Sequence, residues 1–186
     1  MPNEVEIKFR VADVPALEQR LRDAGFHVVT PRTHELNMLY DFGKGRLRKA
    51  GQLLRLRQYG QKWTLTHKAR GSTGIHKTRI ETETQVADGE KMHEILLALG
   101  LVPKFLYEKF RAEWTDGRGH VVIDETPIGN LAEIEGQPDW IEQIAATLGV
   151  NRKQYITQNY AQLFRDWKQH TRSRAENMTF KAVRSG

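Results

Sequence analysis

The chain has 186 residues, a length that suits one domain with its own hydrophobic core. Hydrophobic residues make up 39% of it and charged residues 28%, which are ordinary values for a soluble globular protein. The absence of cysteine excludes disulfides and thiolate metal sites. No apolar run approaches the roughly 18 residues of a membrane span, and the N-terminus carries no apolar secretion segment. We therefore expect a cytoplasmic protein with no membrane partner.

The formal net charge of +6 indicates an anionic partner. Part of this excess lies in residues 169–186, a polar and basic stretch without periodicity. We expect this stretch to be a flexible C-terminal tail that follows a single domain of residues 1–168. A nucleic-acid-binding arm is the alternative interpretation of the tail, although nucleic acid is not the partner we expect. The oligomeric state is not encoded in these patterns, so a homodimer stays open.

Short segments that alternate polar and apolar residues recur along the chain, as they do in β-strands. In the first, residues 4–11, the charged side chains fall on one face and the apolar ones on the other. Further segments of this kind lie at residues 54–57, 63–68, 79–83, 109–113, 121–126 and 131–135. The dipeptides at 59–60 and 116–117 are hairpin signals between them.

Amphipathic helices are expected between and after these strands. Apolar residues repeat at i, i+3, i+4 and i+7 spacing in residues 14–21, 92–99, 141–148 and 160–167. Asp13 is a candidate N-cap for the first helix, and a glycine follows each of the first three. Each apolar stripe needs a partner surface, which the apolar strand faces can supply.

Charged residues of the same type recur in pairs, two positions apart, on the predicted strands. The pairs are Glu4/Glu6, Arg55/Arg57, Glu81/Glu83, Lys109/Arg111 and Glu133/Glu135. Like charges at this spacing share a strand face about 7 Å apart and repel one another. A solvated face is the ordinary interpretation of any single pair. Their repetition favours a closed sheet with its charged face inward, filled by a ligand that carries both signs of charge, such as a polyphosphate with divalent cations.

The order of these motifs resembles the CYTH superfamily, also called triphosphate tunnel metalloenzymes. The sequence EVEIK at residues 4–8 matches the ExExK signature of that family. Six later segments resemble further motifs of that family, in the same order. They are LRLR at 54–57, TLTHK at 64–68, RIETE at 79–83, KFR at 109–111, the segment 123–135 and NYAQL at 159–163. The resemblance spans about residues 3–168 and is closest to class IV adenylate cyclases of the CyaB type.

The resemblance implies an α+β fold: a closed eight-stranded antiparallel β-barrel with a charged lumen and amphipathic helices packed outside. It also implies that acidic side chains hold Mg²⁺ or Mn²⁺ and that basic ones hold a triphosphate. The candidate metal ligands are Glu4, Glu6, Glu81, Glu83, Asp124, Glu133 and Glu135. The candidate triphosphate-binding residues are Lys8, Arg55, Arg57, Lys68, Arg79, Lys109 and Arg111. Salt bridges among these groups are the alternative, and the two roles can coexist.

Two further positions are candidates for roles in catalysis. Lys8 is a candidate for substrate binding or for action near the leaving group. Tyr40 resembles a family position near the lumen, and its alternative role is that of a core aromatic residue. The segment 69–76, which contains two glycines, is either a loop that closes over the substrate or a long hairpin connection.

Two reactions are open for such a site. In a class IV adenylate cyclase the ribose 3′-hydroxyl of ATP attacks the α-phosphorus, which gives cyclic AMP and pyrophosphate. In a triphosphatase, water attacks the terminal phosphorus of inorganic triphosphate, thiamine triphosphate or a nucleoside triphosphate. The resemblance favours the cyclase. A non-catalytic module that binds polyphosphate or RNA ends is the third hypothesis, and the paired carboxylates argue against it because an anion binder gains nothing from them.

Overall fold

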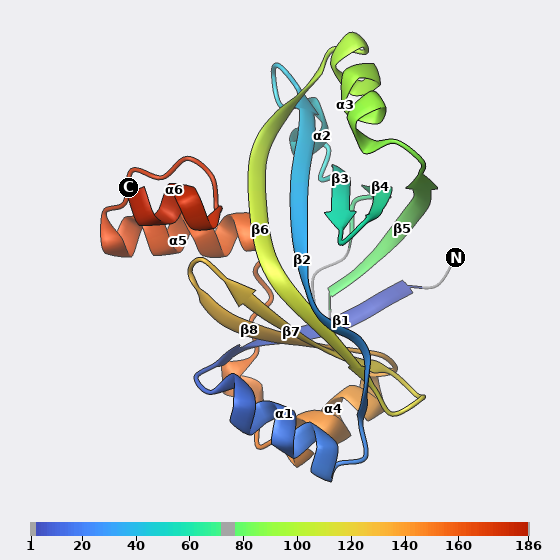
Figure 1. Ribbon diagram of the computed structural model, residues 1–186, viewed down its shortest axis with the longest axis vertical. Coiled ribbons are helices and arrows are strands. Elements are labelled where there is room, and N and C mark those ends of the chain that lie inside the picture. The colour runs from blue at the N-terminus through green and yellow to red at the C-terminus, as the bar shows by residue number, and fades with distance from the viewer. Residues whose placement is uncertain (1–2, 72–76, 186) are drawn as a thin grey trace.

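The computed structural model describes residues 3–71 and 77–185, with side chains for residues 5–71 and 80–185 (Figure 1). The strands are β1 (Asn3–Val11), β2 (His27–Phe42), β3 (Leu53–Tyr59), β4 (Lys62–Lys68), β5 (Lys77–Val86), β6 (Leu101–Thr115), β7 (His120–Thr126) and β8 (Gly129–Glu135). The helices are α1 (Val14–Asp23), α2 (Arg46–Lys49), α3 (Gly89–Ala98), α4 (Pro138–Thr147), α5 (Tyr160–Thr171), α6 (Phe180–Ser185) and the 3-10 turn η1 (Arg152–Gln154). In the described part of the chain, no helix is long and apolar enough to span a membrane. Residues 72–76 of the predicted loop lie outside the described residues.

The eight strands form one antiparallel sheet in the order β1-β5-β4-β3-β2-β6-β7-β8, which returns to β1. β5 and β8, the two neighbours of β1 in this order, pair with different halves of β1. Residues 3–6 pair with β5 and residues 6–11 pair with β8, so within β1 only Glu6 has a partner on both sides. The predicted α+β class and antiparallel sheet are confirmed. Hydrogen bonds do not close the sheet along the whole of β1, so the predicted closed barrel is not confirmed.

The longest strand, β2, is the one that the alternation pattern does not predict. It pairs with β6 from His27 to Phe42, and its register shifts within residues 28–33 and again between Leu39 and Tyr40. Each shift moves the alternation out of phase, and Pro31 removes one backbone donor. The strand is therefore continuous in space although its two-residue period is broken in the sequence.

Helices cover the apolar outer face of the sheet in two places. Below β7 and β8, α1 and α4 lie side by side and bury residues such as Leu21 and Ile141 against Trp114 of β6 (Figure 1). At the other end of the molecule, α3 places Leu96 against Leu56 of β3. These helices, together with α5, confirm the four that the apolar periodicity predicts. The polar face of the sheet consequently faces the interior of the molecule.

The C-terminal residues differ from the flexible tail that we expected. Met178 is fully buried, and its backbone NH donates to the Leu106 carbonyl at 3.0 Å while its own carbonyl accepts from the Glu108 NH at 3.0 Å. The physical reason lies in unequal strand lengths. Because β7 pairs with β6 only from Phe110 onward, the preceding edge of β6 is left for the segment around Met178. A short edge of this kind is a ready template for an extended segment.

We expect Met178→Ala to lower the free energy of unfolding by about 2–4 kcal/mol, because it removes a fully buried side chain and leaves a cavity. Urea denaturation of the full chain measures this change. Arg174→Ala is the matched control, since Arg174 is exposed in the same segment and its loss should change stability by less than about 0.5 kcal/mol. Equal stability of the two variants would show that the C-terminal segment does not pack as described.

Candidate active site

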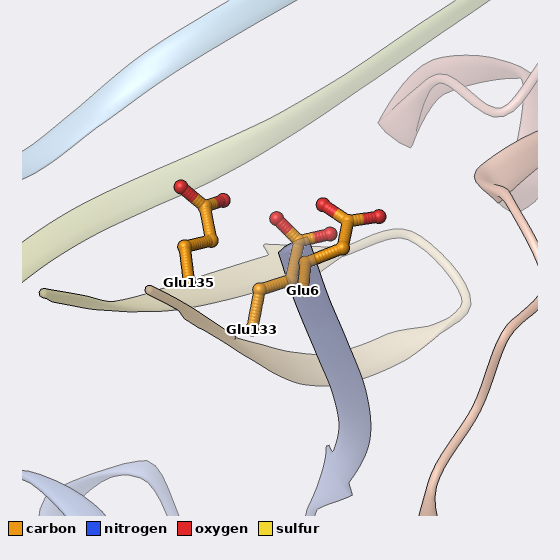
Figure 2. A group of neighbouring side chains, drawn as sticks. All are labelled: Glu6, Glu133 and Glu135. Carbon is orange, nitrogen blue, oxygen red and sulfur yellow. The ribbon is translucent and has the colours of Figure 1, made fainter. Parts of the chain in front are cut away.

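Three glutamates on two neighbouring strands bring their carboxylates together. Glu6 comes from β1, and Glu133 and Glu135 come from β8; one oxygen of each lies within 4.8 Å of the others. The pairing of Glu6 with Glu135 across the two strands brings them together, and all three side chains project to the same side (Figure 2). Hard oxygen ligands at this spacing suit Mg²⁺ or Mn²⁺. We call this group the glutamate triad.

Lys8 lies beside the glutamate triad and is almost completely buried. Its Nζ atom is 2.7 Å from Glu133 Oε1 and 3.9 Å from Glu6 Oε1. Burial alone would lower the pKa of Lys8, but the two carboxylates outweigh burial and raise that pKa above its usual value. Burial would likewise raise the pKa of Glu133, and Lys8 and Arg111 hold it well below its usual value instead. Both groups therefore stay charged at neutral pH.

Asp124 of β7 is fully buried, and its carboxylate accepts hydrogen bonds from several donors. Lys109 Nζ donates at 2.9 Å, Arg111 donates from Nε at 2.7 Å and from Nη2 at 2.6 Å, and the Tyr160 hydroxyl also donates. An ionised carboxylate has about four acceptor sites. These contacts favour a role for Asp124 in anchoring Lys109 and Arg111 rather than in binding a metal.

Glu35 of β2 is a buried carboxylate that the sequence analysis missed. Its Oε1 atom accepts from Asn37 at 2.8 Å and lies 3.4 Å from Lys109 Nζ. Its Oε2 atom is 3.8 Å from Arg57 Nη1 and 4.0 Å from Arg111 Nε, and accepts no hydrogen bond from the described residues. Burial would raise the pKa of Glu35, but the surrounding cations, Lys109 and Arg111 first, lower it to about 2. Glu35 thus connects the cations of β6 with those of β3.

The remaining predicted cations and acids face one another across β3, β4 and β5. Lys68 Nζ lies 2.6 Å from Glu81 Oε2, and Arg57 Nη2 lies 3.3 Å from Glu83 Oε1. Arg55 Nη2 is 3.8 Å from Glu81 and 3.6 Å from Glu83. The side chains of Arg55, Arg57 and Lys68 keep 13–18% of their surface exposed, so a ligand can reach them. These pairs show the salt-bridge role; the predicted roles in metal and triphosphate binding stay predictions.

Three predicted site residues stand apart from this arrangement. The side chains of Glu4 and Arg79 lie outside the described residues, although their backbones pair across β1 and β5. Tyr40 is buried in the outer core with Leu56 and Leu96, where its hydroxyl meets His93 Nδ1. It therefore lies on the opposite face of β2 from Asn37, as a core aromatic residue would, and its catalytic role stays a prediction.

Two aromatic residues that had no predicted role reach the same interior. Tyr160 of α5 contacts Asp124 and Glu133 through its hydroxyl, and its ring stacks on that of Tyr107 at 5.4 Å with an interplanar angle of 17°. No local pattern signals these contacts, because they join α5 to strands far away in the sequence. Glu35 and Asn37 could have been found by extending the alternation through β2.

The interior thus combines a cluster of carboxylates that could hold a metal ion with buried cations on one antiparallel sheet. A sequence profile of the CYTH domain matches residues 2–160. The chain belongs to the CYTH domain family, as the order of its charged motifs predicted.

Known proteins resemble the chain over most of its length. A protein named as a "putative adenylate cyclase" from Methanocaldococcus jannaschii is 27% identical over 172 residues, which cover 86% of this chain and 97% of that protein. A "putative adenylate cyclase" structure from Vibrio parahaemolyticus matches with a TM-score of 0.78 and 18% identity, covering 88% of this chain and 98% of the other. A "putative adenylyl cyclase" from Hippeastrum, titled as revealing a dominant triphosphatase activity, matches with a TM-score of 0.64 and 23% identity over 88% and 95% of the two chains.

The lowered pKa of Glu35 predicts a particular pH dependence of stability. Because its folded pKa is about 2 and its usual value is 4.5, its contribution is present above pH 4.5 and is lost as the pH falls toward 2. The difference in unfolding free energy between the wild type and Glu35→Gln should therefore shrink across this window, on the order of 2–3 kcal/mol in total. Urea denaturation at a series of pH values measures it.

The exposed Glu176→Gln variant is the control and should follow the wild-type curve at every pH. A Glu35→Gln curve that runs parallel to the wild type from neutral pH down to pH 3 would contradict the charge network around Glu35.

Proposed function

We propose that the protein is a divalent-metal-dependent enzyme that acts on a triphosphate held in a tunnel enclosed by the sheet. Conversion of ATP to cyclic AMP and pyrophosphate is the first candidate reaction. The observation that carries this proposal is the glutamate triad beside buried Lys8 and Arg111. In a polyanion with a bound divalent cation, the cation pairs with the glutamates and the anion pairs with Lys8 and Arg111. A cation alone or a polyanion alone would pair with only one of these two groups.

The glutamate triad fits a hard divalent cation. It offers carboxylate oxygens only, and Lys8 and Arg111 keep Glu133 ionised, as a metal ligand must be. A bound Mg²⁺ or Mn²⁺ would neutralise charge that develops on phosphate oxygens during the reaction. Glu4, Glu81 and Glu83 remain further candidates for its ligands.

The cations of the interior would hold the phosphate chain. Arg55, Arg57 and Lys68 are the accessible ones, and their guanidinium and ammonium groups lie near Glu81 and Glu83 in the described structure. Arginine can bind two phosphate oxygens with its planar fork, and lysine supplies a compact charge. We place the triphosphate between these residues and the glutamate triad, with Lys109 and Arg111 beside it.

The two candidate reactions differ in which phosphorus meets the nucleophile. In cyclisation, the 3′-oxygen forms a bond to the α-phosphorus, the bond to the bridging oxygen of pyrophosphate breaks, and the hydroxyl proton is released. In hydrolysis, a water oxygen forms a bond to the terminal phosphorus, the bond from that phosphorus to its bridging oxygen breaks, and orthophosphate, the shortened phosphate chain and a proton are released. Lys8 and Arg111 lie where either reaction needs fixed positive charge. The names of the relatives from Methanocaldococcus and Vibrio support cyclisation.

Hydrolysis is the second candidate, and one finding favours it. The Hippeastrum protein shares the fold and is named as a putative adenylyl cyclase, yet it is described as having a dominant triphosphatase activity. In this proposal the interior residues would bind phosphate and metal, which both reactions require.

Incubation of the purified protein with Mg²⁺ or Mn²⁺ and either ATP or tripolyphosphate separates the candidates. We expect cyclic AMP and pyrophosphate from ATP. Orthophosphate release without cyclic AMP would replace the cyclase by a triphosphatase. Tight binding of tripolyphosphate in the absence of metal, with no product from either substrate, would reject the enzyme altogether.

Glu135→Gln should lower kcat by on the order of 100-fold and raise the Mn²⁺ concentration needed for half-maximal activity, because it removes one charged oxygen ligand of the glutamate triad. Titration of the activity with Mn²⁺ at saturating substrate measures both effects. Glu125→Gln is the matched control, since Glu125 pairs with Arg32 away from the triad and should leave the metal dependence unchanged. An unaltered Mn²⁺ requirement in Glu135→Gln would remove Glu135 from the metal site.

A further inference from the structure

Tyr160 enters the interior from a helix that lies outside the sheet. Its side chain is about nine-tenths buried, and its hydroxyl donates to Asp124 Oδ2 and, at 3.3 Å, to Glu133 Oε1. Tyr160 therefore donates to two carboxylates that also bind the interior cations.

The ring of Tyr160 lies close to two lysines. Lys109 Nζ is 4.6 Å from the ring centroid and Lys8 Nζ is 5.2 Å from it, and both distances are within the range of cation–π attraction. The ring also stacks on Tyr107 of β6. It therefore attracts both ammonium groups.

The start of α5 is held firmly, so the position of Tyr160 is well defined. Asn159 caps the helix: its side chain accepts from the Gln162 NH at 2.9 Å, and the Gln162 side chain accepts from the Asn159 NH at 2.9 Å. The Ile156 NH donates to the Lys8 carbonyl at 2.7 Å, which ties the preceding segment to β1. Leu163 and Phe164 anchor the next turn in the core.

We infer that Tyr160 is a positioning residue that lets Lys109 and Arg111 turn from Asp124 to the phosphate chain. In the described structure these two cations supply the other hydrogen bonds to Asp124. When phosphate draws them away, a fully buried carboxylate loses donors, and an uncompensated buried charge is costly. The Tyr160 hydroxyl donates to Asp124 from α5 and carries no charge that phosphate would attract, so it stays on Asp124 and reduces that cost. The inference rests on the proposed function, since it requires a polyphosphate ligand.

Tyr160→Phe removes the hydroxyl and keeps the ring beside the lysines. We expect the Kd for tripolyphosphate in the presence of Mn²⁺, measured by calorimetry, to rise about tenfold. The KM for the same compound as substrate should rise equally, with kcat changed by less than about threefold. Tyr155→Phe is the matched control: it also deletes a tyrosine hydroxyl that donates to a glutamate, Glu142 at 3.2 Å, but this pair lies at α4. Its Kd and KM should equal those of the wild type.

A purely structural role of Tyr160 would give a different result. Partial unfolding of Tyr160→Phe lowers the calorimetric stoichiometry and kcat but leaves Kd and KM unchanged, and that outcome would overturn the inference. A wild type that binds tripolyphosphate without turnover would refute the proposed enzyme, and the comparison of Kd values would still decide the role of Tyr160. A wild type that binds no tripolyphosphate would overturn both.

Discussion

The structure depends on balance between charges that are removed from water. Glu35 and Asp124 are fully buried, Lys109 is nearly so, and Glu133 and Lys8 are each about 4% exposed. An isolated ion in such a place costs several kcal/mol, so each of these groups is tolerable only because the others lie within hydrogen-bonding or close Coulombic range. The paired charges of the individual strands, which are repulsive along each strand, become favourable when strands of opposite charge meet.

The same balance shapes how a ligand is received. The cations are held in fixed places by carboxylates, and positions set before binding reduce the entropy that a ligand must lose. Those carboxylates are also competitors, because each phosphate oxygen must replace an existing ion pair. The less buried pairs on β3, β4 and β5 are easier to exchange than the Asp124 and Glu35 contacts. A triphosphate bound as proposed would therefore exchange the accessible pairs before the buried ones.

Much of the fold could be predicted from the sequence, because two signals agree over most of the chain. Two-residue alternation locates seven of the eight strands and the face of each that carries charge, and apolar periodicity locates α1, α3, α4 and α5. Pairs such as Glu133 and Glu135 then identify the triad, since alternate residues on a strand must share a face.

What the sequence could not supply has physical causes. The register shifts of β2 confine its regular two-residue period to residues 33–39, a stretch that contains Glu35 but is too short to stand out beside the broken pattern on either side. Contacts such as that of Tyr160 with Asp124 join residues 36 positions apart and depend on where α5 packs. The C-terminal segment resembles a disordered tail in composition. Met178 is buried because β6 extends beyond its pairing with β7, which leaves an edge on which this segment packs.

The position of β1 has a consequence for how the chain folds as it leaves the ribosome. β1 is made first, yet its partners are β5 and β8, and the last donor to Asp124 comes from α5. Until β8 has emerged, Lys8 lacks the strand that pairs with it, and until Tyr160 has emerged, Asp124 lacks its last donor. Such distant pairing is slow to form. The nascent chain therefore exposes the edges of its strands during most of its synthesis, and this is the stage at which chaperones would matter most.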